Sequence, residues 1–237
     1  KEFNPSSIIW DYEFDFQKTV PSYLEGQETT TYNLNKKAVY FNGQNSRLTL
    51  PNSANEFEVG PFAVWVEWMP TNDKNSSQQL MGHYNWEIWQ DINKVKFFVG
   101  RMNNASGPQY FLNYPITSDF FNQKHSALAI YNPGENGYIE LWIDGNSAGR
   151  ITIGSDIIWK DYNTNKDLSF GWTPHNYEKS PYFQGYIYKA DFSYTNLSLW
   201  SNNSSFKTNE EYLKVPILIN NSLESIRIKV IEENKVR

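Results

Sequence analysis

The sequence contains no cysteine, and this absence removes several functions at once. Without thiols the chain can form no disulfide, bind no metal through thiolates and carry out no cysteine catalysis. Secreted eukaryotic domains often contain disulfides, so the absence also favours a prokaryotic or viral source. With 237 residues, the chain can nevertheless bury a large core without cross-links, because a chain of this size hides roughly 70% of its unfolded surface.

Long apolar runs and stripes of positive charge are also missing. The strongest apolar run, Phe62–Met69, is too short to cross a bilayer and is interrupted by Glu67. The net charge is −5, and the Lys and Arg residues are scattered. We therefore expect no nucleic-acid partner and no insertion of this segment into a membrane. Because the chain begins with Lys1 rather than Met, we interpret it as a processed protein or as part of a larger chain.

Motifs of the common hydrolases are absent as well. His83, His125 and His175 lie in unrelated segments, and no His-x-His, His-Glu-x-x-His or Gly-x-Ser-x-Gly pattern occurs. One pair of carboxylates, Glu87 and Asp91, would share a face of a strand. Four steps of ~3.3 Å place them about 13 Å apart, whereas glycosidases need about 5 Å or about 6.5–9.5 Å. We therefore expect no enzyme activity, with a glycoside hydrolase or polysaccharide lyase as the less favoured alternative.

Aromatic residues, in contrast, are abundant, at 17% of the chain. Short segments rich in aromatic and β-branched residues alternate with turn sequences, and helical periodicity is almost absent. Asp144-Gly145 between two apolar runs is a strong hairpin signal, because both residues tolerate positive φ. A short helix is expected near 118–122. The pattern predicts an all-β sandwich with strands over 8–16, 38–41, 47–50, 62–68, 86–91, 95–99, 126–131, 138–143, 148–153, 168–172 and 186–194.

The composition changes near Tyr194. Residues 196–205 are polar and rich in Asn and Ser, which is typical of a loop or linker. Two strand-like stretches, 215–219 and 225–231, follow. We therefore divide the chain into a sandwich domain over residues 1–200 and a C-terminal part over residues 201–237, which is either an additional hairpin that completes a sheet or the beginning of a connection to another domain.

Five segments occur in the order found in laminin G-like domains. WDYEFD (10–15) resembles the opening "W-x-F-D" strand, and KKAVYFNGQNSRLTLP (36–51) resembles the "A-L-x-F-D-G" segment. The strand within 57–70, the hairpin YIELWIDGNSAGRITI (138–153) and the closing pair within 168–190 follow. Over residues 9–195 the chain thus resembles the laminin G-like, concanavalin A-like family. The resemblance implies a two-sheet antiparallel jelly-roll sandwich.

Members of this family bind sugars, proteins or lipids, and some carry a calcium ion at the rim. The resemblance therefore implies a binding module at the cell surface or outside the cell, with a glycan or a cell-surface protein as partner. Calcium is the candidate cofactor, with Asp15, Asn42 and Asp191 as candidate ligands. Asn42 replaces an aspartate of the family pattern, and fewer carboxylates weaken calcium binding. Whether these residues bind calcium or cap turns stays open.

The strand predicted over 86–91 carries the strongest candidate site. Glu87, Trp89 and Asp91 share one face of an extended strand. A tryptophan ring can stack on a sugar while carboxylates accept hydrogen bonds from hydroxyl groups. We predict a non-catalytic module that binds carbohydrate, and a protein-binding adhesion or assembly domain is the alternative. Packing of Trp89 against a neighbouring loop and of Trp172 in the core is the competing structural interpretation. The candidate ligand-binding residues are Glu87, Trp89, Asp91, Arg101, Trp172, His175 and Tyr177.

Overall fold

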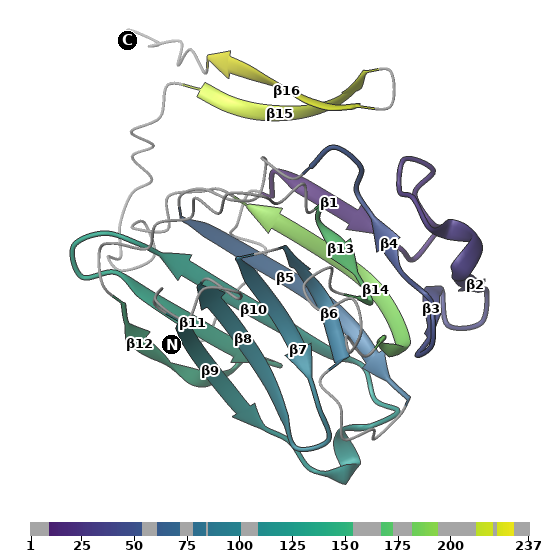
Figure 1. Ribbon diagram of the computed structural model, residues 1–237, viewed down its shortest axis with the longest axis horizontal. Helices are drawn as coiled ribbons and strands as arrows, with labels where there is room; N and C mark the ends of the chain where they lie inside the picture. Colours follow the sequence, from purple (N-terminus) through teal and green to yellow (C-terminus); the bar gives the residue numbers. More distant parts are fainter. Residues whose placement is uncertain are drawn as a thin grey trace, which may run out of the picture.

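Alternating apolar and polar residues build two antiparallel sheets in the computed structural model (Figure 1). The structure describes residues 10–53, 61–71, 78–83, 85–100, 109–153, 167–172 and 182–193, and the backbone of 212–219 and 222–229. In these residues no helix is long and apolar enough to cross a bilayer. The two short 3-10 helices are η2 (Gln27–Thr29) and η3 (Ser118–Phe120).

The larger sheet, here called sheet A, contains eight strands. Strand β1 pairs with β14 beside the main order of the sheet. That order is β12 (Asn146–Thr152), β11 (Tyr138–Ile143), β10 (His125–Asn132), β5 (Phe62–Pro70), β14 (Gln184–Ser193), β3 (Ala38–Asn42) and β2 (Thr31–Asn33), with β1 spanning Tyr12–Asp15.

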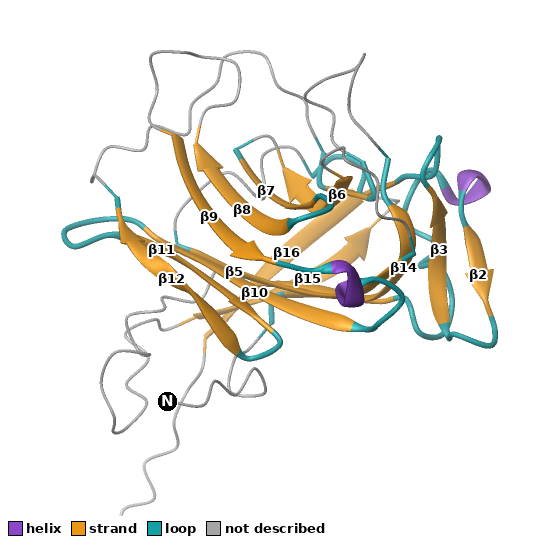
Figure 2. Ribbon diagram, turned by 90° about the horizontal axis from the view of Figure 1, so that it is seen from below, coloured by secondary structure: helices purple, strands orange, loops and turns teal. Residues whose placement is uncertain are grey.

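The smaller sheet, here called sheet B, contains six strands and lies over sheet A (Figure 2). Its edge strand β9 contacts β11 and β12, so the two sheets close on each other at that side. The order of sheet B is β4 (Leu48–Thr49), β13 (Ser169–Phe170), β6 (Gln78–His83), β7 (Trp86–Gln90), β8 (Lys94–Gly100) and β9 (Gln109–Pro115). The prediction of a two-sheet antiparallel jelly roll is confirmed.

Aromatic rings fill the space between the sheets. The Phe62 ring on β5 lies 5.2 Å from Trp86 and 6.4 Å from Phe97, both in sheet B. In sheet A it lies 5.3 Å from Phe192 and 5.2 Å from Tyr131. All five side chains are almost completely buried. Burial at roughly 25 cal/mol per Å² makes such large rings the main contributors to the core.

Several predicted strands differ from the structure in their bounds. The first strand covers only Tyr12–Asp15, and residues 1–9 lie outside the described part. The stretch 168–172 forms only the two-residue strand β13, and the expected helix near 118–122 is a single 3-10 turn. Sequence reasoning missed β2, β6 and β9. In β6 a register shift between Gln79 and Met81 breaks the alternation that would have revealed a strand.

The C-terminal residues include one hairpin. Strands β15 (Tyr212–Ile219) and β16 (Ser222–Lys229) pair with each other along their whole length and form a separate two-stranded sheet. The first of these strands begins three residues earlier than the stretch 215–219 expected from the sequence. The division of the chain at residue 200 stays a prediction.

Two glycines with nearly the same positive φ differ in the space around them. Gly171 has φ 74° and Gly145 has φ 75°. A Cβ atom on Gly171 would lie 2.2 Å from the Phe41 ring, whereas a Cβ atom on Gly145 would meet nothing within 4 Å. The first position therefore requires glycine for both conformation and space, and the second for conformation alone.

We expect Gly145→Ala to lower the free energy of unfolding by about 1–2 kcal/mol, the cost of a left-handed alanine. Gly171→Ala has the same cost and adds about 1–3 kcal/mol for the overlap with Phe41. Urea unfolding followed by tryptophan fluorescence measures both. Equal losses in the two variants would show that the ring of Phe41 moves aside freely.

Candidate functional site

The outer face of sheet B gathers side chains from three neighbouring strands. Trp86 and Ile88 on β7 point into the core, so Glu87 and Trp89 point outward. Trp89 lies opposite Lys96 on β8, and Lys96 lies opposite Asn113 on β9. The pairing of β7, β8 and β9 therefore brings residues about 25 positions apart in the chain onto one surface.

Three rings on this surface form an aromatic strip made of Trp89, Phe98 and Phe111. The ring centroids of Trp89 and Phe98 are 6.2 Å apart, with the planes at 27°. Those of Phe98 and Phe111 are 5.0 Å apart. Phe98 is fully buried, Trp89 is partly buried, and Phe111 is 39% exposed. The strip thus has a buried centre and two rings that reach the surface.

The ammonium group of Lys96 lies over the two outer rings of the strip. Its Nζ atom is 4.8 Å from the centroid of Trp89 and 5.2 Å from that of Phe111. A cation within about 6 Å of a ring face is attracted by the ring quadrupole. Burial lowers the pKa of Lys96, Lys94 lowers it further, and Asp91 opposes this effect. The strip therefore holds a partly desolvated positive charge.

Glu87 and Gln79 lie beside the strip and are buried. The carboxylate of Glu87 accepts a hydrogen bond from Nε1 of Trp89, which fixes the orientation of the indole. The side-chain amide of Gln79, opposite Trp89, has no hydrogen-bond partner among the described residues. A Cβ atom on Gly82 would lie 2.0 Å from Nε2 of Gln79. Glycine at position 82 therefore leaves the space that this amide occupies.

The structure brings only some of the site residues predicted from the sequence together. Glu87 and Trp89 lie together as expected. Asp91 lies just after β7, and its carboxylate accepts hydrogen bonds at 3.0 Å from the backbone N–H groups of Asn93 and Lys94. Asp91 thus caps the hairpin turn, and its role in ligand binding stays a prediction. The other predicted residues Arg101, His175 and Tyr177 lie outside the described residues.

Trp172 lies toward the other edge of sheet B, directly after β13. Only 9% of it is exposed, and its ring stacks on Tyr182 at 6.2 Å. The guanidinium of Arg47 lies 5.0 Å from the centroid of Trp172. Arg47 also lines a polar pocket of about 390 Å³ together with Glu25 and Glu28. Trp172 therefore belongs to the opposite end of the sheet from the aromatic strip.

Sequence reasoning missed Lys96, Phe98 and Phe111. The predicted hairpin gave only part of the signal for the first two, because its three-residue turn at 92–94 would place Phe97 opposite Trp89. In the structure Asp91 already pairs with Lys94, so Lys96 lies opposite Trp89 and Phe98 opposite Glu87. Phe111 belongs to β9, which was not predicted. Its position on the same face as Trp89 depends on the pairing of β8 with β9.

The candidate calcium ligands already interact with protein groups. One carboxylate oxygen of Asp15 accepts a backbone N–H, and Oδ1 of Asn42 accepts the N–H groups of residues 44–46. Asp191 is buried, which raises its pKa to about 7 although Lys189 Nζ lies 2.7 Å from Oδ2. The described residues contain no group of three or more His, Asp or Glu side chains suited to a metal ion. Calcium binding stays a prediction.

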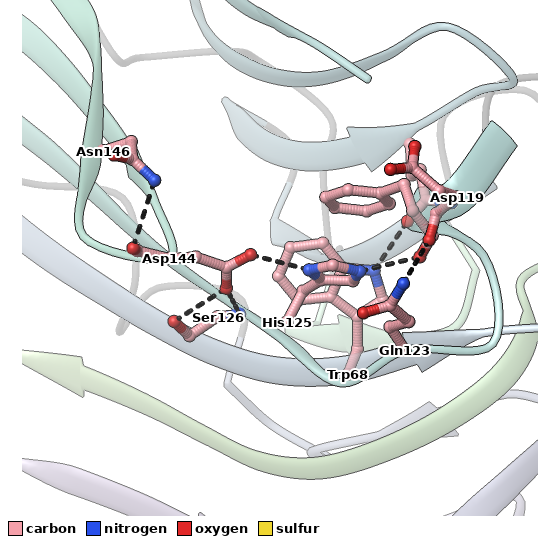
Figure 3. Close-up of polar contacts among 9 residues, drawn as sticks. Trp68, Asp119, Gln123, His125, Ser126, Asp144 and Asn146 are labelled. Atoms are coloured by element: carbon pink, nitrogen blue, oxygen red, sulfur yellow. Dashed lines mark hydrogen bonds and ion pairs between the residues drawn. The ribbon is translucent and has the colours of Figure 1, made fainter. Parts of the chain in front are cut away.

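A second polar cluster joins two turns of sheet A (Figure 3). Nδ1 of His125 lies 2.6 Å from Oδ2 of Asp144, and Nε2 lies 2.7 Å from the carbonyl oxygen of Phe120. The rings of His125 and Phe120 stack at 3.4 Å, with Trp68 at 5.9 Å from the imidazole. Ser126 donates its backbone N–H to Asp144 at 2.7 Å. Since both ring nitrogens face protein acceptors, His125 acts as a structural connection.

Comparison with known proteins finds no matching family model and no matching curated protein. Similar solved structures include the carbohydrate-binding module CBM40 of the Ruminococcus gnavus IT-sialidase, solved with α2,3-sialyllactose. It has a TM-score of 0.56 and 14% identity, over 68% of this chain and 91% of that chain.

The endo-β-1,4-glucuronan lyase of the fungus Trichoderma reesei is also similar, with a TM-score of 0.53 and 10% identity over 79% of this chain and 96% of the lyase. The binding domain of botulinum neurotoxin DC, solved with SialylT, has a TM-score of 0.51 and 12% identity. This match covers 73% of this chain and 42% of the toxin chain. At such identities the similarity shows the fold alone.

We expect Asp144→Asn to lower the free energy of unfolding by about 1 kcal/mol at pH 7, because a partly exposed, charge-assisted hydrogen bond is lost. Asparagine tolerates the φ of 50° at this position. Burial alone would raise the pKa of Asp144, but hydrogen bonds from His125 and Ser126 outweigh burial and lower the pKa below 3.8.

A carboxylate with a lowered folded-state pKa contributes stability above its unfolded pKa and loses it as the pH falls through the folded value. The difference in the free energy of unfolding between wild type and Asp144→Asn should therefore have its full value at pH 7 and shrink below pH 3.8. Urea unfolding across a pH series measures it. A difference that stays constant with pH would contradict an ionised Asp144 in this cluster.

Proposed function

We propose that this laminin G-like, concanavalin A-like jelly-roll domain is a non-catalytic binding module that recognises carbohydrate. The observation that carries the proposal is the aromatic strip on the outer face of sheet B, where Trp89 and Phe111 reach the surface beside a positive charge. We further propose that the domain works at the cell surface or outside the cell, as part of a larger chain.

The strip suits the apolar face of a sugar ring. Trp89 is oriented by its hydrogen bond to Glu87 and supported by the buried Phe98 ring. A platform that is already ordered loses little conformational entropy when a ligand binds. Many different sugars can stack on an aromatic ring, so the polar groups around the strip would select among ligands.

The carboxylates of Glu87 and Asp91 have other roles in the structure. Glu87 is buried and bonds the indole of Trp89, and Asp91 caps the hairpin turn. Hydrolysis by a carboxylate pair requires both groups to flank one glycosidic bond. These contacts support a binding role rather than a hydrolytic one.

We expect Trp89→Ala to weaken glycan binding at least about tenfold, or about 1.4 kcal/mol, because it removes the stacking surface. Phe111→Ala should weaken binding several-fold, since this ring is the exposed end of the strip. A glycan array first identifies a bound oligosaccharide, and titration calorimetry then measures its affinity for each variant.

Trp65 provides a matched control, because it is a partly buried tryptophan on the outer face of sheet A and its Nε1 donates to Glu67 at 3.2 Å. Trp65→Ala should leave glycan affinity unchanged, while thermal melting checks that each variant is folded. Binding of no glycan on the array would contradict the proposal. Loss of binding in Trp65→Ala but not in Trp89→Ala would move the site to sheet A.

A further inference from the structure

We propose that Lys96 makes the aromatic strip selective for acidic carbohydrates, that is, sugars carrying a carboxylate or sulfate group. The inference rests on the proposed glycan-binding function and adds the charge of the ligand to it. The feature that motivates it is an ammonium group placed on two rings of the strip, without an acidic partner among the described residues.

The other Lys and Arg side chains on the strands of sheets A and B pair with carboxylates. Lys189 lies 2.7 Å from Asp191, and Arg150 lies 2.8 Å from Glu140. Lys94, two residues before Lys96 on the same strand, lies 3.7 Å from Asp91. Lys96 forms no ion pair with any carboxylate of the described residues and lies over Trp89 and Phe111 instead. Lys96 therefore has no direct carboxylate partner in the part of the protein that the structure describes, and only the more distant charge of Asp91 opposes the fall in its pKa.

The surroundings of Lys96 on the outer face add little negative charge. Asn113, the residue opposite it on β9, is neutral. The carboxylate of Glu87 on β7 is buried and accepts the indole N–H of Trp89. Asp91 interacts with Lys94 and with the backbone of its own turn. Among the described residues, the groups that reach the surface along the strip are thus two aromatic rings, one ammonium group and the neutral Asn113 side chain.

This combination distinguishes sugars by charge. The rings can stack on the apolar face of any pyranose, so they do not separate acidic from neutral sugars. The ammonium group carries three N–H donors and no acceptor, and it is partly desolvated by the rings below it. A carboxylate or sulfate that reaches Lys96 forms a charge-assisted hydrogen bond, which is about twice as strong as a bond to a neutral hydroxyl.

The experiment compares glycans that differ only in charge. A tetrasaccharide of β-1,4-linked glucuronic acid and cellotetraose share ring and linkage and differ at C6, which bears a carboxylate in one and a hydroxymethyl group in the other. Sialyllactose with its carboxylate methyl ester, and a sulfated with an unsulfated galactoside, extend the comparison. Affinities are measured by titration calorimetry, and an array that contains such matched pairs covers glycans outside this panel.

The variant Lys96→Met keeps an unbranched side chain over the rings but removes the charge. We expect the affinity for the acidic member of a bound pair to fall about tenfold to a hundredfold, and that for the neutral member to stay unchanged. Lys96→Arg should retain the acidic preference, because it keeps the charge. Lys18→Gln, at a side chain that is 86% exposed beside Asp15, is the control for net charge and should have no effect.

The outcomes separate the two proposals. Equal wild-type affinity for acidic and neutral members, a preference for neutral glycans, or an acidic preference that survives in Lys96→Met would overturn the role of Lys96 and leave glycan binding intact. Binding of no glycan in the panel or on the array would overturn both. An acidic preference that weakens with rising salt and disappears in Lys96→Met alone would support the inference.

Discussion

The ring of Phe62 lies between the two sheets and contacts aromatic side chains from both, among them Trp86 of sheet B and Phe192 of sheet A. Successive residues of a strand point to opposite faces, so burying Trp86 and Ile88 inside forces Glu87 and Trp89 outside. A shift of β7 by one residue would exchange the two sets. The composition of the candidate site is therefore a consequence of the packing of the core.

The two outer faces of the sandwich use charge differently. On sheet A, Lys189 is bracketed by Asp191 and Glu13 at 2.7 and 3.5 Å. On sheet B, Lys96 lies over aromatic rings and forms no ion pair with a carboxylate of the described residues. The charge of Lys189 is thus already satisfied within the protein, whereas a positive charge on an aromatic surface offers both stacking and an electrostatic contact. This difference is why we place the binding surface on sheet B.

Local sequence patterns predicted much of the fold. The hairpin of β11 and β12 was marked by Asp144-Gly145, and the buried strand β5 by its apolar run. Strand β6 was not readable, because Gln79 and Gly82 interrupt its apolar pattern and a register shift breaks its alternation. Strand β9 was missed too, and with it the Phe111 ring of the site.

Taken alone, the sequence determined the all-β sandwich, the strand face shared by Glu87 and Trp89, and the absence of thiol chemistry, because each depends on residue type or on spacing within one strand. The tertiary structure decided which of the candidate residues meet. Pairing between strands placed Lys96 and Phe111 beside Trp89, directed Asp91 into its own turn, and set Trp172 toward the opposite edge of the sheet. Such contacts depend on registers between distant segments, which no local pattern specifies.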